Sequence, residues 1–125
     1  MKYFFQLLII SVLLFSCNIR IAKKYEGTYE CKIHTYQFDI LSGSSSEWSE
    51  GIVNLERENT TLNWFERGKI INASDIKDGY YEEIGHYGSP VFQIHFLKDS
   101  IRITFSGSGH GGSSSTNYYG TKISD

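Results

Sequence analysis

The two cysteines of this chain stand in different surroundings, and these surroundings decide what their thiols can do. Cys17 ends an apolar run that follows Lys2, with Ser16 directly before it. Cys31 lies in a segment where apolar and polar residues alternate. A cysteine can form a disulfide, ligate a metal or carry a lipid. The residues around each cysteine indicate which of these roles it has.

The segment Leu14-Phe15-Ser16-Cys17 resembles the lipobox of bacterial lipoproteins, with a branched apolar residue three positions before the cysteine and a small residue next to it. The apolar core before it, residues 3–15, has 13 residues. A signal-peptide core has about 7–15 residues, whereas a membrane-spanning helix needs about 20. The resemblance implies a diacylglycerol on the Cys17 thiol and cleavage after Ser16. The alternatives are a secreted protein in which Cys17 has no role, or a short uncleaved anchor.

Lipid on Cys17 would leave Cys31 as the one thiol of the mature chain, without a partner for an intramolecular disulfide. We therefore expect Cys31 to be buried and unpaired. Residues 17–24 are expected to form a lipidated tether. Its three cations, Arg20, Lys23 and Lys24, would either touch anionic headgroups or lie in a solvated linker.

Residues 107–112, Gly-Ser-Gly-His-Gly-Gly, formally match the dinucleotide-binding pattern G-x-G-x-x-G. That pattern holds a pyrophosphate only where the third glycine opens a helix. Here serines, Thr116 and a tyrosine-rich segment follow. We interpret the run as a flexible hairpin loop and expect no cofactor.

Catalytic and metal-binding signals are also weak. None of His34, His86, His95 and His110 stands at short ligand spacing from another ligand, as zinc sites usually require. The pair Glu82-Glu83 would point to opposite faces of a strand, and no serine lies in a Gly-x-Ser-x-Gly turn. We expect no metal site and no enzymatic activity, and an enzyme is the least favoured function.

Aromatic side chains are the remaining candidates for ligand contact, because flat rings suit apolar ligands and sugars. Most must form the core of so small a domain, but some could face a cavity or an open surface. The candidate ligand-facing residues, chosen from an aromatic set that also includes Tyr36, Tyr81 and Tyr119, are Trp48, Trp64, Tyr80, Tyr87 and Tyr118.

Asp99-Ser100-Ile101 resembles the Asp-Ser/Thr-apolar site at which Bacteroidota O-glycosylate exported proteins. The resemblance makes Ser100 a candidate O-glycosylation site. A hairpin turn is the alternative explanation for the same residues.

The mature chain would have 109 residues, enough for one domain, residues 25–125. It carries 11 Lys and Arg against 14 Asp and Glu, dispersed along the chain, which gives no basis for nucleic-acid binding. Tyrosine, tryptophan, isoleucine and threonine favour strands, while the glycines favour turns. No segment of the mature chain has a helical repeat over three turns.

Alternation of apolar and polar residues from Tyr25 onward predicts a strand, and the Gly/Ser runs 42–46 and 106–115 predict loops. Further strands are expected at 69–71, 79–84 and 116–123. One hairpin would turn at Glu58-Asn59, pairing Leu55 with Leu62 and Val53 with Trp64. A second would turn at Lys98-Asp99; its pairs are Phe92 with Phe105, Gln93 with Thr104, Ile94 with Ile103, His95 with Arg102 and Phe96 with Ile101.

These elements predict an all-β fold: an antiparallel up-and-down barrel or sandwich of seven or eight strands, after the signal peptide at 1–16. An opening Gly27-Thr28-Tyr29 and a closing Tyr-Gly-Thr-Lys at 119–122 resemble the small lipocalin-like or calycin-like lipoproteins of Bacteroidota.

We therefore expect a cell-envelope lipoprotein, held on a membrane through Cys17, that works as a non-catalytic binding module. Its partner would be a small apolar ligand, a glycan or an envelope protein. A purely structural or inhibitory lipoprotein without a ligand cavity is the alternative. Because Asn18 follows the cysteine where an Asp is associated with inner-membrane retention in enterobacteria, the outer membrane is the favoured location.

Overall fold

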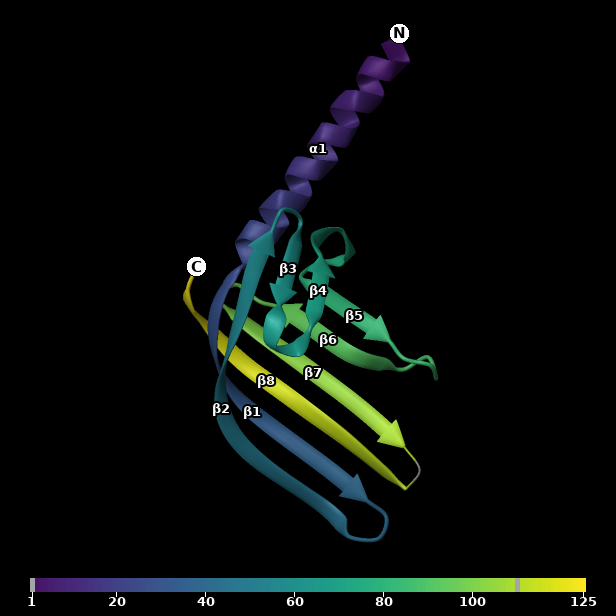
Figure 1. The fold of residues 1–125 in the computed structure, drawn as a ribbon, viewed down its shortest axis with the longest axis vertical. Coiled ribbons are helices and arrows are strands. Elements are labelled where there is room, and N and C mark those ends of the chain that lie inside the picture. The colour runs from purple at the N-terminus through teal and green to yellow at the C-terminus, as the bar shows by residue number, and fades with distance from the viewer. Residues whose placement is uncertain (1, 110) are drawn as a thin grey trace. The chain divides into compact units, whose positions relative to one another are not determined.

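The fold is described from a computed structural model that covers residues 2–109 and 111–125 (Figure 1). It begins with one helix, α1 (Lys2–Tyr25), and continues with strands and two single-turn helices. These are β1 (Gly27–Asp39), β2 (Gly43–Glu58), β3 (Thr61–Trp64), η1 (Phe65–Arg67), β4 (Lys69–Asn72), η2 (Ala73–Asp75), β5 (Tyr80–Ile84), β6 (Pro90–Phe96), β7 (Ser100–Gly109) and β8 (Gly112–Ser124).

The eight strands form one antiparallel sheet in the order β4-β3-β2-β1-β8-β7-β6-β5. Each of β2, β3, β6 and β7 lies between its neighbours in sequence, β1 and β8 pair with each other, and β4 and β5 are the edge strands. This cyclic order is that of an up-and-down barrel, and a single sheet is what the barrel alternative requires. The prediction of a small all-β antiparallel fold of seven or eight strands is confirmed.

The chain divides into two compact units, and β2 runs from one into the other. The first comprises residues 1–26 and 55–76. Within it, α1 packs against β3 and η2. The buried apolar residues of this unit are Ala22, Leu55, Leu62, Trp64, Ile71, Ala73 and Ile76.

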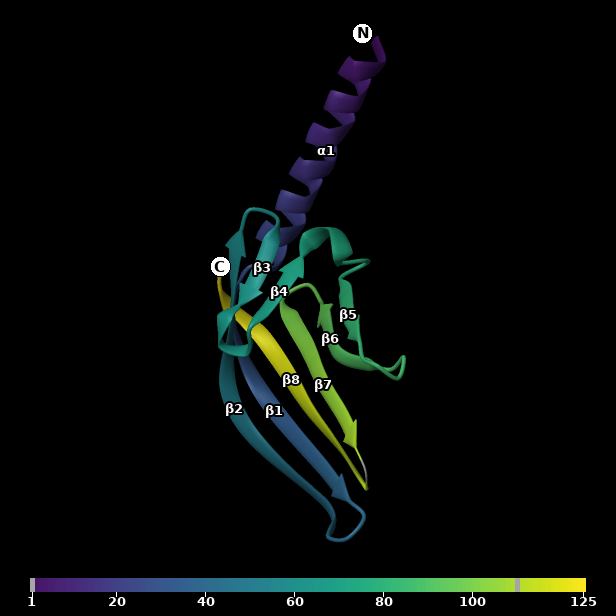
Figure 2. The ribbon, with the colours of Figure 1, turned by 45° about the vertical axis from the view of Figure 1, so that its right-hand side comes forward.

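The second unit comprises residues 27–54 and 77–125. β1, β8 and β7 run side by side in both ribbon views, and their hairpin turns lie at the same end (Figures 1 and 2). A row of aromatic rings crosses four neighbouring strands on the inner face: Tyr81 and Phe92 are 6.0 Å apart between ring centroids, Phe92 and Phe105 5.0 Å, and Phe105 and Tyr118 6.1 Å. Aromatic pairs at these distances stabilise a sheet beyond the area they bury.

The β6–β7 hairpin has the predicted register. All five expected pairs, from Phe92 opposite Phe105 to Phe96 opposite Ile101, are observed. Phe92, Ile94, Phe96, Ile101 and Ile103 are all buried. Strict alternation on both strands rules out a shift by one residue, which would expose every apolar side chain, and the two-residue turn at Lys98-Asp99 sets the register among those that remain.

The β2–β3 hairpin does not have the predicted register. Arg57, not Leu55, lies opposite Leu62, and the two-residue turn is Asn59-Thr60 rather than Glu58-Asn59. The shift by two residues keeps Leu55 and Leu62 buried, so hydrophobic patterning could not distinguish the two registers. The turn determines which of the two registers forms, because Asn59 has a φ of 56°, a left-handed conformation that asparagine tolerates well.

The two Gly/Ser runs are not loops, which corrects the prediction. β2 begins at Gly43, and β7 and β8 extend to Gly109 and Gly112, so these runs form the far ends of long strands. His110 lies outside the described residues. Serine and glycine have low strand propensity, but each strand end gains a partner, as in Ser106 opposite Ser115, and backbone hydrogen bonds override a weak local preference.

The apolar N-terminal segment forms a helix long and apolar enough to cross a membrane, which is compatible with a signal peptide or a membrane anchor. The helix does not end at the apolar core but continues through the residues expected to form a tether, as far as Tyr25. The strand expected from Tyr25 therefore begins at Gly27 instead. Glu26 donates a backbone hydrogen bond of 2.9 Å to the Ala22 carbonyl, which closes the last turn.

Candidate functional site

Six large apolar side chains are exposed on one face of three neighbouring strands, β2, β1 and β8. Side chains alternate between faces along a strand, and on these strands the residues of opposite parity, such as Cys31, Val53 and Tyr118, are buried. We name this surface the outer aromatic face; its members are Tyr36, Phe38, Trp48, Ile52, Tyr119 and Ile123.

Trp48 is the centre of this face. Its side chain is 62% exposed, and two neighbouring rings lie close to it. The His34 ring centroid lies 4.6 Å away and that of Tyr119 6.0 Å away. The Arg102 guanidinium lies 5.3 Å from the Tyr119 ring centroid, a cation–π arrangement. The rings thus contact one another and a cation in the absence of a partner.

Charged groups of both signs border the rings. Lys32 and Arg102 lie directly opposite Tyr119 on the two flanking strands. Lys32, Trp48, Ser49 and Glu50 line a shallow surface recess of about 580 Å³. The face therefore combines an apolar centre with charged margins, the composition typical of protein interaction surfaces.

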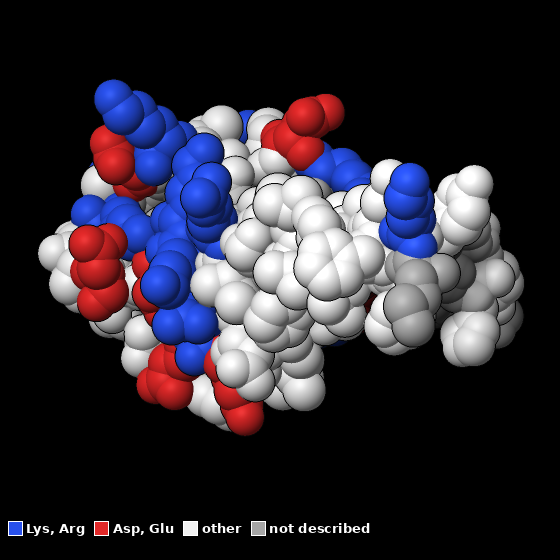
Figure 3. All heavy atoms as spheres, turned by 90° about the horizontal axis from the view of Figure 1, so that it is seen from above, with Lys and Arg blue, Asp and Glu red and all other residues white. Residues whose placement is uncertain are grey.

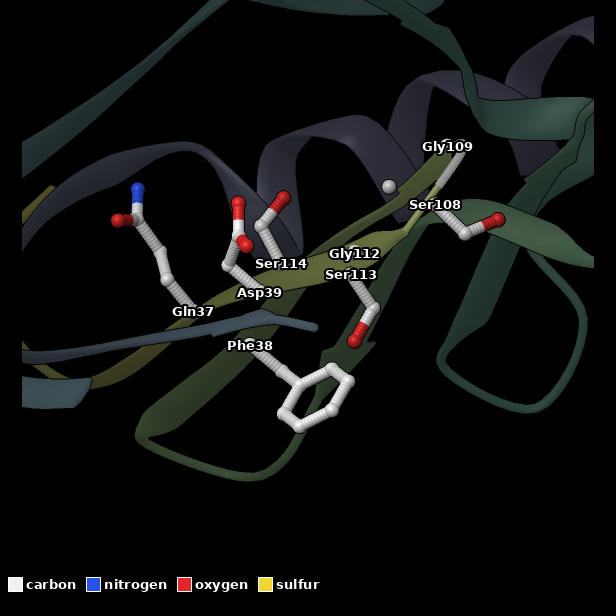
Figure 4. A pocket seen from close by; sticks show the side chains of 9 residues that line it. Gln37, Phe38, Asp39, Ser108, Gly109, Gly112, Ser113 and Ser114 are labelled. Carbon is white, nitrogen blue, oxygen red and sulfur yellow. The ribbon is translucent and has the colours of Figure 1, made fainter. Parts of the chain in front are cut away.

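A second, polar recess of about 440 Å³ lies where β1, β7 and β8 end (Figure 4). In Figure 4 the side chains of Gln37, Asp39 and Ser114 point to one side, whereas Phe38 points to the other. The Asp39 carboxylate accepts backbone hydrogen bonds from Leu41 at 2.7 Å and Ser42 at 3.3 Å. Asp39 therefore stabilises the β1–β2 turn.

The five aromatic residues singled out from the sequence lie in different places. Trp64 and Tyr118 are 2% and 4% exposed, so they are core residues and offer no ring face to solvent. Tyr80 is half-buried; its hydroxyl donates a 2.8 Å hydrogen bond to Glu82, and its ring is packed edge-on against His95. Tyr87 is exposed in the β5–β6 connection, away from the rings around Trp48.

Sequence reasoning missed Phe38, Ile52, Ile123 and Arg102 as parts of this surface. The sequence pattern does indicate their exposure, because each of these residues occupies a position of opposite parity to the buried residues of its strand. Phe38 and Ile52 could have been assigned by continuing the alternation through the β1–β2 turn, but that turn stood in a segment interpreted as a loop.

Among the described residues, no three His, Cys, Asp or Glu side chains come together as a metal site. The recess of about 510 Å³ around His86 is lined by glycine, serine and apolar residues and contains no carboxylate. Partial burial, followed by the hydrogen bond from Tyr80 to Glu82, raises the pKa of Tyr80.

Cys31 is buried and forms no disulfide, as expected. Desolvation raises the pKa of its thiol to about 11, against a smaller opposing effect of a backbone hydrogen bond at Val53. Such a thiol is a poor nucleophile at neutral pH because the thiolate is the reactive form. Cys17, in contrast, is exposed.

The fold and this surface define an all-β antiparallel protein with an apolar N-terminal helix and an exposed set of rings. Comparisons with models of protein families, with curated proteins and with solved structures yield no match for the chain. The functional argument therefore depends on the residues themselves.

Proposed function

We propose that this protein is a lipoprotein of the bacterial cell envelope, held on the outer membrane by lipid on Cys17, whose β domain binds another envelope protein. The lipobox-like segment that ends at Cys17 is the basis for the anchor. Asn18 in the following position favours the outer membrane by analogy. The outer aromatic face is the basis for the binding role.

The pattern of exposure along α1 supports cleavage before Cys17. Every residue from 2 to 17 is exposed, whereas Asn18, Ile19, Ile21 and Ala22 are half-buried or buried. Among the described residues 2–16, cleavage after Ser16 would therefore remove no buried or half-buried side chain. Cys17 itself is accessible, as acylation and cleavage require.

Substitution Cys17→Ser tests the anchor. A serine cannot form the thioether, so the variant is expected to remain an uncleaved precursor of higher mass. Ser16→Ala, which keeps a small residue before the cysteine, is the matched control and should be processed. A Cys17→Ser protein that is still cleaved and still sediments with membranes would contradict the proposal.

The outer aromatic face supports a protein as the partner. Contiguous exposed apolar residues on a soluble surface mark interaction sites, and Trp, Tyr and Arg dominate the energetics of protein interfaces. One residue of each type is present here: the Tyr119 ring lies close to both the Trp48 ring and the Arg102 guanidinium. Because neighbouring groups already contact these rings, binding would cost little side-chain entropy.

The same geometry is less suited to a small apolar ligand. Such ligands are typically enclosed in concave pockets that bury most of their surface, whereas Trp48 stands on an open strand face. A contact through the outer aromatic face needs no cavity, so it is also compatible with the alternative of a structural or inhibitory lipoprotein. We further propose that the protein is not an enzyme, because the recess around His86 contains no carboxylate and the sequence has no Gly-x-Ser-x-Gly turn.

Site-specific photocrosslinking in the native cells tests the binding role. A photoreactive phenylalanine analogue at Tyr119 is expected to form one discrete, protease-sensitive adduct, and Trp48→Ala should reduce that adduct at least several-fold. Tyr87, which is even more exposed but lies outside the face, is the matched control and should yield none. Equal adducts from both positions, or an adduct that survives Trp48→Ala or complete proteolysis, would reject the proposal.

A further inference from the structure

The last two turns of α1, residues 18–25, would stay on the mature protein if cleavage follows Ser16. In the first unit these turns pack against β3 and η2. Ala22 is fully buried, and Asn18, Ile19, Ile21 and Tyr25 are half-buried. We name these eight residues the retained helix.

An ion pair fastens the end of this helix. Arg57 on β2 lies 3.5 Å from the carboxylate of Glu26, the residue that follows α1. Both side chains are about two-thirds shielded from solvent. Packing through Ala22 and this ion pair both oppose separation of the retained helix from the first unit.

The exposed side of the retained helix is basic. Cys17, Arg20 and Lys24 follow the spacing i, i+3, i+7 and therefore lie on one stripe of the helix, with Lys23 beside it. All four are exposed, and Ala22 lies on the opposite side. The thiol that would carry the lipid thus shares a helix face with three cations.

Charge is unevenly divided between the two units. The first unit, counted from Cys17, has six basic and five acidic residues, whereas the second has five basic and nine acidic. Figure 3 shows a group of Lys and Arg side chains together on the face seen from above, with acidic side chains around it. The lipid attachment point therefore belongs to the unit that an anionic surface repels least.

We propose that the retained helix is not a flexible tether but stays docked on β3 and η2, and that Arg20, Lys23 and Lys24 contact anionic phospholipid headgroups. This inference rests on the proposed lipidation of Cys17. Lipid chains entering the bilayer from Cys17 would bring the basic stripe to the headgroup layer. Each such cation contributes about fivefold in affinity near an anionic surface.

The experiment uses the full lipidated protein, purified in detergent and reconstituted into vesicles of phosphatidylcholine alone or mixed with phosphatidylglycerol. Brief acetylation followed by mass spectrometry compares Lys23 and Lys24 with Lys98, an exposed lysine between β6 and β7. We expect several-fold slower labelling of Lys23 and Lys24 on the anionic vesicles and no change at Lys98. Equal rates on the two vesicles would overturn the headgroup contact.

Amide hydrogen exchange on the same samples tests docking. Residues 19–25 are expected to exchange as slowly as β3, and Ala22→Glu, which places a charge in the packed position, should make them fast. Slow exchange at Ile94 and Ile103 in this variant would establish that the sheet remains folded. Fast exchange in the unsubstituted protein would overturn the docked helix.

Flotation of the protein with vesicles tests the lipid anchor separately from the headgroup contact. A protein that does not float with phosphatidylcholine vesicles lacks the lipid, which contradicts the proposed function. A protein that floats with both vesicles but shows equal lysine labelling refutes only the inference.

Discussion

Cys31 and Gly120 lie opposite each other on β1 and β8, and the Cys31 thiol occupies the space that a side chain at position 120 would need. A β-carbon added at Gly120 would come within 2.6 Å of the Cys31 sulfur and 2.7 Å of the Ile101 side chain. Glycine is therefore needed at this position for close packing, not for a special backbone angle. The desolvated thiol is the consequence.

Gly120→Ala should lower the free energy of unfolding by roughly 1–3 kcal/mol, because both neighbours are buried and cannot move away. Gly109→Ala in the same hairpin is the control, since nothing lies within 4 Å of its added β-carbon. Chemical denaturation of both variants measures the difference. A loss of equal size at both positions would show that strand entropy, not packing, is what glycine provides.

Cys31 also predicts a pH dependence. The thiol titrates near its ordinary pKa of 9.0 in the unfolded chain and at about 11 in the folded chain. Its contribution to stability is therefore complete below pH 9 and is lost as the pH rises towards 11, by about 2–3 kcal/mol in total.

Denaturation at a series of pH values, with Cys31→Ala as reference, isolates this contribution. The stability difference between the two proteins should shrink between pH 9 and 11. A difference that stays constant over this range would show that the thiol remains as solvated as in the unfolded chain.

At the scale of elements, the turn between β2 and β3 explains why one hairpin could be predicted and the other could not. In β6–β7, the predicted turn at Lys98-Asp99 is the observed one, so the register that this turn sets was predicted as well. In β2–β3, two registers bury the same side chains, so the choice depends on the backbone of Asn59. Such a preference, of about 1 kcal/mol, is invisible to hydrophobic periodicity.

Asn59→Ala should therefore destabilise the protein by about 1 kcal/mol, because alanine is strained at a φ of 56°. Asn59→Gly relieves that strain and should be close to neutral. Thermal unfolding compares the two. An alanine variant as stable as the glycine variant would mean that the turn does not hold this conformation.

The secondary structure of the Gly/Ser runs and of the retained helix also could not be predicted from the periodicity of the sequence alone. Serines at 113–115 become strand because β7 lies beside them, and residues 18–25 become helix next to β3 and η2. Both outcomes depend on partners that are distant in sequence. The alternating parts of the strands and the inner core were predictable because each has a local pattern.

At the scale of the whole molecule, the two units have different tasks in this account. The first carries the lipid site and the basic retained helix, and the second carries the outer aromatic face and most of the acidic residues. The proposed function thus assigns attachment and recognition to different units. Attachment through lipid on Cys17 requires that the mature protein begin at this residue.

Mass spectrometry of the N-terminal peptide from the protein's own host is the most direct test of that requirement. We predict a mature chain that starts at Cys17 and carries the added mass of a diacylglycerol on this residue, with or without an acyl group on its amino nitrogen. An N-terminus upstream of Cys17, or an unmodified Cys17 in a chain that remains on the membrane, would contradict the account.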